Sequence, residues 1–303
     1  MIKNTPNIIL VVLAFFAIYF IWGTTFLANL FGLEGMKPFV LTTFRYAPAG
    51  LLLAGWCYIK KISFPGAKDI KVLSISGVLM LVCGSGLIVV GQQYINSGHA
   101  AVVTATEPLL FLLLDKKNWK TYFSNKWIIA GLLSGFAGIV IFSYFTTGDN
   151  FQAANHSDVI KGTILVLLSA VFWVAGTLYA KNNTTAGTSN IANVAIQLIA
   201  AAVASAIIAM FLGEWKSFQP QQVSLQAWAG LLYLIIMGTL IAFIAFMWLV
   251  TIKPPAIVST HTYVNPIVAV FMGWLMAKEE LVAIQITGLG MVITGVILTG
   301  IKK

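Results

Sequence analysis

Two ionisable side chains, Arg45 and Glu107, lie inside long apolar stretches of the sequence. A charge at the centre of a membrane-spanning helix costs about 2.5–3.5 kcal/mol on an insertion scale, and such residues usually face a cavity or each other. Arg45 could hold a carboxylate, and Glu107 could hold an amine or a proton, so a zwitterion such as an amino acid would satisfy both charges. The alternative interpretation is that Arg45 and Glu107 pair with each other as a structural link.

Two prolines, Pro108 and Pro266, lie in the middle of apolar stretches. A proline removes a backbone donor, so the carbonyls of Thr104 and Thr262 lose their helical partners. Free backbone groups are tolerated at membrane depth where they line a cavity. The alternative is an ordinary kink whose carbonyl is satisfied by a threonine hydroxyl. We expect both prolines to kink helices at one cavity.

Aromatic and polar side chains near these positions extend the candidate site. The candidate substrate-binding residues are Trp22, Arg45, Glu107, Trp173, Tyr179, His261 and Asn265. Glu107 is also the candidate coupling residue. For the aromatic residues the alternative is packing or an interfacial belt, and for His261 it is a hydrogen bond to a neighbour. We interpret Gly84-Ser85-Gly86 as small residues that let helices approach closely.

Motifs of soluble enzymes are absent from the sequence. It contains no GxxxxGK[ST] phosphate loop, no GxGxxG, no HExxH and no GxSxG. The three histidines are scattered, and both cysteines lie in apolar stretches, so neither residue type suggests a metal site. We therefore expect neither an enzyme nor a cofactor or metal.

The elements that carry these residues are membrane-spanning helices. The chain is 59% hydrophobic and 9% charged, whereas a soluble domain carries about 25% charged residues. Its net charge of +9 is spread in short runs between apolar stretches, which does not indicate a nucleic-acid-binding face. About 20 apolar residues cross a bilayer. The expected spans are 8–27, 39–59, 71–94, 97–114, 125–145, 160–180, 190–212, 226–250, 256–275 and 281–300.

Lysine placement predicts the orientation. If the N-terminus is cytoplasmic, thirteen of the seventeen lysines fall on the cytoplasmic side. Because cytoplasmic loops carry the excess of basic residues, we expect a multi-pass protein of the inner (cytoplasmic) membrane with both termini in the cytoplasm.

An internal repeat relates the two halves of the chain. Aligning Pro108 with Pro266 brings Glu107 over Asn265, and Gly131 then matches Gly288 within one residue. Each half holds five spans, and because five is odd, the second half enters the membrane inverted.

The predicted fold is therefore an all-α integral membrane protein with ten transmembrane helices arranged as two inverted five-helix repeats. The first repeat covers residues 1–150 and the second covers 158–303.

The chain resembles the EamA-type family of the drug/metabolite transporter superfamily over nearly its whole length. The motifs that carry the resemblance are Trp22-Gly23-Thr24-Thr25-Phe26, Phe44-Arg45-Tyr46, Glu107-Pro108, Asn265-Pro266 and Lys278-Glu279-Glu280. The first half departs from the family pattern, since Asp115–Lys120 replaces the acidic turn expected after the fourth span. The resemblance implies two EamA-like repeats and the transport, usually export, of amino acids or similar metabolites through a central cavity.

We expect a secondary transporter of small polar metabolites such as amino acids, which works by alternating access through a midplane cavity. Its partners would be a small-molecule substrate, the lipid bilayer and, as a candidate coupling ion, protons, with no nucleic acid. One alternative is a nucleotide-sugar or lipid-linked sugar carrier, which would need more basic cavity residues than Arg45. The other is a non-transporting receptor or structural protein. The substrate, coupling ion, direction and oligomeric state are left open.

Overall fold

The computed structural model describes residues 7–114, 126–144, 156–253, 255–277 and 283–299, and regular structure among them is entirely helical. The first half contains α1 (Ile8–Phe16), η1 (Ala17–Ile21), α2 (Trp22–Leu33), α3 (Pro38–Ile59), α4 (Ala67–Gly77), η2 (Val78–Gly86), α5 (Leu87–Gly91), α6 (Ser97–Thr104), α7 (Glu107–Leu114) and α9 (Lys126–Tyr144). The second half contains α10 (His156–Asn183), α11 (Asn190–Phe211), α12 (Glu214–Ser217), η4 (Pro220–Gln222), α13 (Leu225–Tyr233), η5 (Leu234–Phe243), α14 (Ile244–Ile252), α15 (Pro255–Val258), α16 (His261–Ala277) and α17 (Ala283–Thr299).

Six helical segments among the described residues are long and apolar enough to cross a membrane. They are Ile8–Leu33, Ala67–Gly91, Ser97–Leu114, His156–Asn183, Asn190–Phe211 and Leu225–Ile252. Their outward faces carry large apolar side chains, such as Phe16 on α1 and Phe211 on α11, which are 62% and 80% exposed. Extensive exposed apolar surface of this kind is typical of a protein surrounded by lipid.

Helices lie at all ten predicted spans, but only the six segments above have the length and hydropathy of a membrane span among the described residues, and the ninth predicted span is interrupted at Ser259 and Thr260. The first span was expected to end at residue 27, but α2 continues to Leu33. The polar Asn29 does not end the helix, because its side chain is buried and its amide nitrogen donates to Oε1 of Gln92 at 3.0 Å. The segment Asp115–Lys120 and the turn Lys278–Glu280 lie outside the described residues, as do the two chain ends and residues 145–155.

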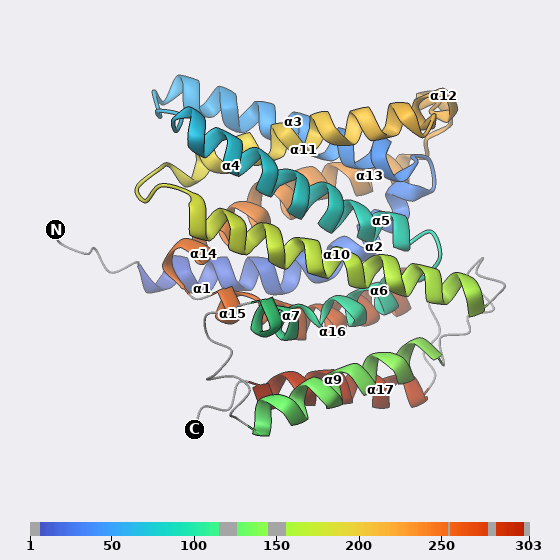
Figure 1. Cartoon of the computed structure of the whole chain (residues 1–303). Helices are drawn as coiled ribbons and strands as arrows, with labels where there is room; N and C mark the ends of the chain where they lie inside the picture. The colour runs from blue at the N-terminus through green and yellow to red at the C-terminus, as the bar shows by residue number, and fades with distance from the viewer. Residues whose placement is uncertain (1–6, 115–125, 145–155, 254, 278–282, 300–303) are drawn as a thin grey trace.

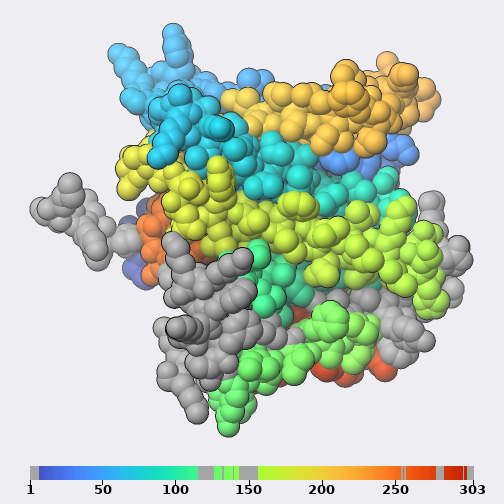
Figure 2. Space-filling view, in the orientation of Figure 1, coloured from blue at the N-terminus to red at the C-terminus, as the bar shows by residue number. Residues whose placement is uncertain are grey.

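The helices lie side by side in layers (Figure 1). α3 and α11 pack together at one end of the stack, α10 and the α6–α7 segment lie in the middle, and α9 pairs with α17 at the other end. The space-filling view shows the same order from the side chains of α3, α4 and α11 to those of α9 (Figure 2).

Glycines allow the close contact between α9 and α17. A Cβ atom on Gly138 would lie 2.6 Å from the carbonyl oxygen of Gly288, and one on Gly295 would lie 2.5 Å from that of Gly131. No larger residue fits without moving a backbone, so these helices approach as small-residue pairs in membranes do.

Three of the long helices contain wide π-type turns. These are η1 in the first helix, η2 between α4 and α5, and η5 between α13 and α14. Such turns often mark functional sites because they re-aim side chains and backbone carbonyls. η2 and η5 both contribute walls to the cavity described below.

The N-terminus of α3 is capped by the other half of the chain. Oε2 of Glu214 accepts hydrogen bonds from the backbone N–H groups of Phe39 at 2.8 Å and Val40 at 3.0 Å. These N–H groups have no partner within their own helix, and a carboxylate also suits the positive end of the helix dipole. Burial raises the pKa of Glu214, and the two backbone hydrogen bonds oppose that rise.

Candidate functional site

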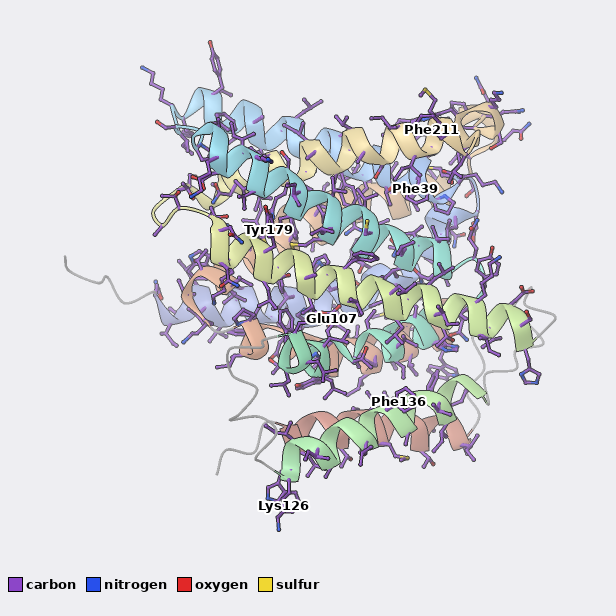
Figure 3. All side chains as sticks on the ribbon, viewed as in Figure 1. Phe39, Glu107, Lys126, Phe136, Tyr179 and Phe211 are labelled. Carbon is purple, nitrogen blue, oxygen red and sulfur yellow. The ribbon has the colours of Figure 1, made fainter. Side chains whose placement is uncertain are left out.

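A cavity with an empty volume of about 630 Å³ lies between the helices of both halves. Its walls come from α2, α3, η2, α5, α6 and α7 of the first half and from α10, η5 and α16 of the second. Glu107 lies near the middle of the stack of helices (Figure 3).

Six of the seven candidate substrate-binding residues line this cavity. They are Trp22, Arg45, Glu107, Trp173, His261 and Asn265. The seventh, Tyr179, does not line it. Tyr179 lies six residues beyond Trp173 on α10, nearer the end of that helix (Figure 3), and its backbone carbonyl accepts a hydrogen bond from the side chain of Asn183.

Arg45 is held in the cavity by hydroxyl groups. Its Nε donates to Oγ1 of Thr239 at 2.9 Å, and its Nη1 lies 3.5 Å from Oγ of Ser85. Thr239 in turn donates to the carbonyl of Leu234 at 2.8 Å, which fixes the direction of the accepting lone pair. The guanidinium is therefore oriented by neutral partners and keeps its positive charge available to a carboxylate.

Glu107 is buried at the start of α7 and is 5% exposed. Its Oε2 atom has no hydrogen-bond partner. Within the described part of the chain no ion pair joins Glu107 to Arg45, whose own contacts are hydroxyls and the Tyr46 ring. The cavity therefore holds a guanidinium and an ionisable carboxyl group, neither of which has a charged partner among the described residues.

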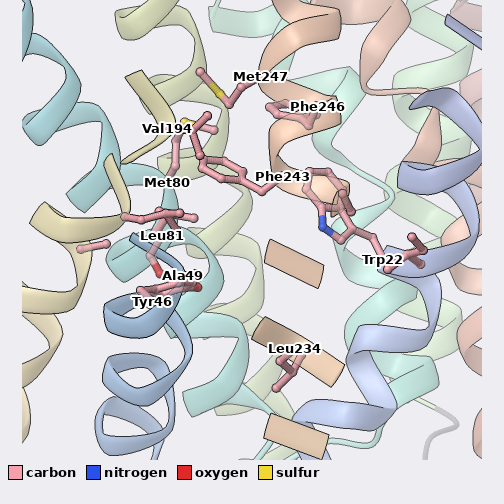
Figure 4. Packing of buried hydrophobic residues seen from close by; sticks show 14 of the residues in the cluster. Trp22, Tyr46, Ala49, Met80, Leu81, Val194, Leu234, Phe243, Phe246 and Met247 are labelled. Atoms are coloured by element: carbon pink, nitrogen blue, oxygen red, sulfur yellow. Dashed lines mark hydrogen bonds between the residues drawn. The ribbon is translucent and has the colours of Figure 1, made fainter. Parts of the chain in front are cut away.

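An aromatic cluster forms one wall (Figure 4). The rings of Trp22 and Trp173 meet edge to face with centroids 5.4 Å apart, and both lie about 5 Å from Phe246. Figure 4 shows Trp22 and Phe246 of this cluster. The indole N–H of Trp22 donates to the carbonyl of Gly238 at 3.0 Å. In contrast, Nε1 of Trp173 is buried without a partner. A free N–H in an apolar wall is a donor that a ligand could use.

The helix breaks do not both fall at the prolines. Directly before Pro108, Ala105 and Thr106 form a turn between α6 and α7. Pro266 instead lies inside α16, and the interruption falls earlier, at Ser259 and Thr260. α16 continues through Pro266, which lacks the backbone N–H that would otherwise bond to the Thr262 carbonyl.

Asn265 and His261 form a pair one helical turn apart. Three backbone carbonyl oxygens surround one end of the Asn265 amide, and Nδ1 of His261 lies 3.0 Å from its other end. The imidazole packs edge to face against Trp22 with centroids 4.8 Å apart. Nε2 of His261 is buried without a partner.

Sequence reasoning missed the hydroxyl and amide groups of the cavity wall. Ser85, Thr239 and Asn29 all line the cavity, although Ser85 was interpreted as a packing residue. Two of them share a recognisable signal, because Gly84-Ser85 and Gly238-Thr239 each place a hydroxyl after a glycine in the middle of an apolar helix.

Known proteins share both the sequence pattern and the fold. The sequence model of the EamA-like transporter family matches residues 9–144 and 160–301. The chain is 31% identical to the uncharacterized inner membrane transporter YedA of Escherichia coli strain K12, over 96% of this chain and 90% of that protein. It is 22% identical to the uncharacterized transporter YdfC of Bacillus subtilis strain 168, over 93% of this chain and 88% of the relative.

A solved crystal structure aligns over 95% of both chains with a TM-score of 0.66 at 17% identity, so it shares the fold. The family match covers nearly the whole chain, and the apolar helices and the cavity between them agree with it. The chain belongs to the EamA-like transporter family and is a membrane transporter, not an enzyme.

Proposed function

We propose that this protein is a secondary transporter, and specifically an exporter, of small polar metabolites such as amino acids. The observation that carries the proposal is the central cavity, where Arg45 and Glu107 present a guanidinium and an ionisable carboxyl group without a charged partner among the described residues. An amino acid carries both complementary charges. Its carboxylate would bind the guanidinium of Arg45, and its ammonium group would bind the carboxylate of Glu107.

The proposed architecture is ten transmembrane helices in two inverted repeats, 1–150 and 158–303, in an inner membrane. Three observations support it. The family model matches two segments that fall within these ranges. The π-type segments η2 and η5 occupy matching places in the third span of each half. The contact of Gly138 with Gly288 also has a counterpart in the contact of Gly295 with Gly131, as a two-fold relation requires.

Alternating access follows from this architecture. In inverted repeats the substrate site stays near the midplane while the halves rock against each other. Glu107 is the proposed coupling residue, because a buried carboxyl group could exchange a proton as the cavity changes sides. The transported molecule would combine apolar and polar parts, because the cavity lining combines aromatic rings with a few ionisable, hydroxyl and amide groups.

A sugar-nucleotide carrier receives less support from the cavity. A nucleotide diphosphate carries several negative charges and would need several cations around it. Among the described lining residues Arg45 is the single arginine or lysine.

Flux through purified protein tests the function directly. Protein in liposomes is loaded with unlabelled amino acids, and uptake of labelled amino acids is followed as counterflow. We expect saturable uptake for at least one amino acid that exceeds uptake by empty liposomes. A receptor or structural protein would give no uptake above that background for any amino acid.

Orientation can be tested with cysteines placed at two exposed lysines. In a variant lacking Cys57 and Cys83, Lys216→Cys should react with an impermeant maleimide in intact cells, and Lys60→Cys should react only after lysis. The reverse pattern would overturn the proposal that both termini are cytoplasmic.

A further inference from the structure

The His261 side chain is a buried ring with one unused nitrogen. It is 3% exposed and lines the cavity. Nδ1 faces the Asn265 side chain, whereas Nε2 has no hydrogen-bond partner. The chemistry of Nε2 therefore depends on which ring nitrogen carries the proton.

The groups around Asn265 determine which ring nitrogen of His261 carries the proton. Its amide nitrogen faces the carbonyl oxygens of Tyr19 at 2.7 Å, His261 at 2.9 Å and Ile18 at 3.2 Å. Carbonyl oxygens only accept hydrogen bonds, so the amide group that faces them must be the NH₂. The amide oxygen is then left facing Nδ1 of His261 at 3.0 Å. Because that oxygen only accepts, Nδ1 must carry a hydrogen.

A neutral imidazole with its hydrogen on Nδ1 presents Nε2 as a hydrogen-bond acceptor. The ring cannot easily turn away, since Trp22 and Phe246 pack against it with centroids 4.8 and 5.9 Å from its own. Two residues that line the cavity, His261 and Glu107, thus each carry a buried acceptor atom without a partner, Nε2 and Oε2. Two acceptors in one cavity match a group with more than one N–H.

We propose that Asn265 is a positioning residue that fixes the tautomer of His261, and that Nε2 of His261 accepts an N–H from the ammonium group of the substrate. The inference rests on the proposed function, since it assigns one end of the substrate within the same cavity. It also defines specificity. A primary or secondary amine satisfies Nε2, whereas a quaternary amine has no N–H and leaves that acceptor buried and unpaired.

The tautomer can be read without any substrate. The chain has three histidines, so ¹⁵N-histidine labelling in lipid nanodiscs gives a small set of ring signals, which His99→Gln and His156→Gln variants assign. We expect His261 to show a protonated Nδ1 and an unprotonated Nε2. A proton on Nε2, with or without one on Nδ1, would overturn the proposal.

Variants of Asn265 test the positioning role. Asn265→Leu removes the acceptor, so the His261 signals should move to a mixture of tautomers. Asn265→Gln keeps both an amide oxygen for Nδ1 and an NH₂ group for the carbonyls, and it should retain the single tautomer. Asn193→Leu, which removes another buried asparagine from α11, should leave the His261 signals unchanged. If Asn265→Leu folds and keeps the wild-type tautomer, Asn265 does not position the ring. If the Asn265 variants do not fold, the wild-type spectrum still decides the tautomer.

The ligand contact is tested with glycine and its N-trimethylated form, glycine betaine. Glycine at saturating concentration should shift the Nε2 signal, and glycine betaine should not. The contact is refuted if glycine causes no shift or if both compounds shift the signal equally. These outcomes differ from failure of the proposed function, because counterflow could then still occur in liposomes. A chain with the expected tautomer but no flux for any amino acid would refute the function instead.

Discussion

The proposed repeat places Glu107 and Asn265 at matching positions in the two halves, yet their side chains have different partners in the structure. Each directly precedes a proline, and each is almost fully buried, with 5% and 2% exposed. Both ends of the Asn265 amide have hydrogen-bond partners within the protein, which are carbonyls of the first helix and the carbonyl and ring of His261. Oε2 of Glu107 bonds to nothing.

The different use of Glu107 and Asn265 suggests that the two halves contribute different kinds of groups to the cavity. The first half supplies both charged groups of the cavity, Arg45 and Glu107, whereas the second half supplies neutral groups such as Thr239 and Asn265 that hold other residues in place. A matching position therefore predicts the place of a residue better than its role.

The largest expected effect is that of Glu107→Gln on transport. The variant keeps the shape of the side chain but loses its charge, and a hydrogen bond to a charged group contributes about 1.5–3 kcal/mol. We expect counterflow to fall roughly 10- to 100-fold and to lose its dependence on pH, with thermal stability close to that of the wild type. Glu34→Gln, the same change at an exposed carboxylate, serves as the control. Wild-type rates with an unchanged pH profile would remove Glu107 from the mechanism.

Arg45→Lys should have the next largest effect. Lysine keeps the charge but cannot present the guanidinium fork that Thr239 and Ser85 orient. We expect the KM for an amino acid to rise about tenfold, which corresponds to about 1.4 kcal/mol. Concentration dependence of counterflow measures it, with Lys216→Arg as an exposed control. An unchanged KM would mean that Arg45 does not bind the carboxylate.

Asn265→Ala should affect stability in a way that Glu107→Gln does not. The carbonyls of Ile18 and Tyr19 would lose a buried donor, which costs on the order of 1–3 kcal/mol. Thermal unfolding of both variants in the same detergent provides the measurement. If Glu107→Gln lowers the melting temperature more than Asn265→Ala does, the contrast between a structural Asn265 and an unpaired Glu107 is wrong.

The smallest expected effect separates Trp173 from Tyr179 on the same helix. Trp173→Phe removes the free indole N–H of the cavity wall, and we expect a loss of a few-fold in apparent affinity, equivalent to about 1 kcal/mol. Tyr179→Phe should have no effect, since Tyr179 does not line the cavity. Equal effects of the two substitutions would show that lining this cavity does not matter for binding.

The helices could be predicted from the sequence because the bilayer fixes their length and composition. Charged cavity residues were also predictable, since Arg45 and Glu107 are conspicuous where charge is costly. The interruption before α16 could not be predicted from Pro266. It falls at Ser259 and Thr260, at positions that no local sequence rule singles out.

The role of Asn265 was hidden for a different reason. Its partners Ile18 and Tyr19 are more than 240 positions away in the sequence, so the contact exists only after the first and ninth spans meet. The roles of Ser85 and Thr239 could not be predicted because hydroxyl residues are common in membrane helices. Their role is seen only in the structure, where both hydroxyl groups contact the guanidinium of Arg45.

The hydrogen bonds that cross between the halves bear on how the protein is made. Glu214 of the second half caps α3 of the first, Thr239 holds Arg45, and Asn265 binds carbonyls of the first helix. While the ribosome has delivered only the first half, Arg45 and the start of α3 lack these partners. These groups of the first half therefore gain their final hydrogen bonds only after the second half has been synthesised.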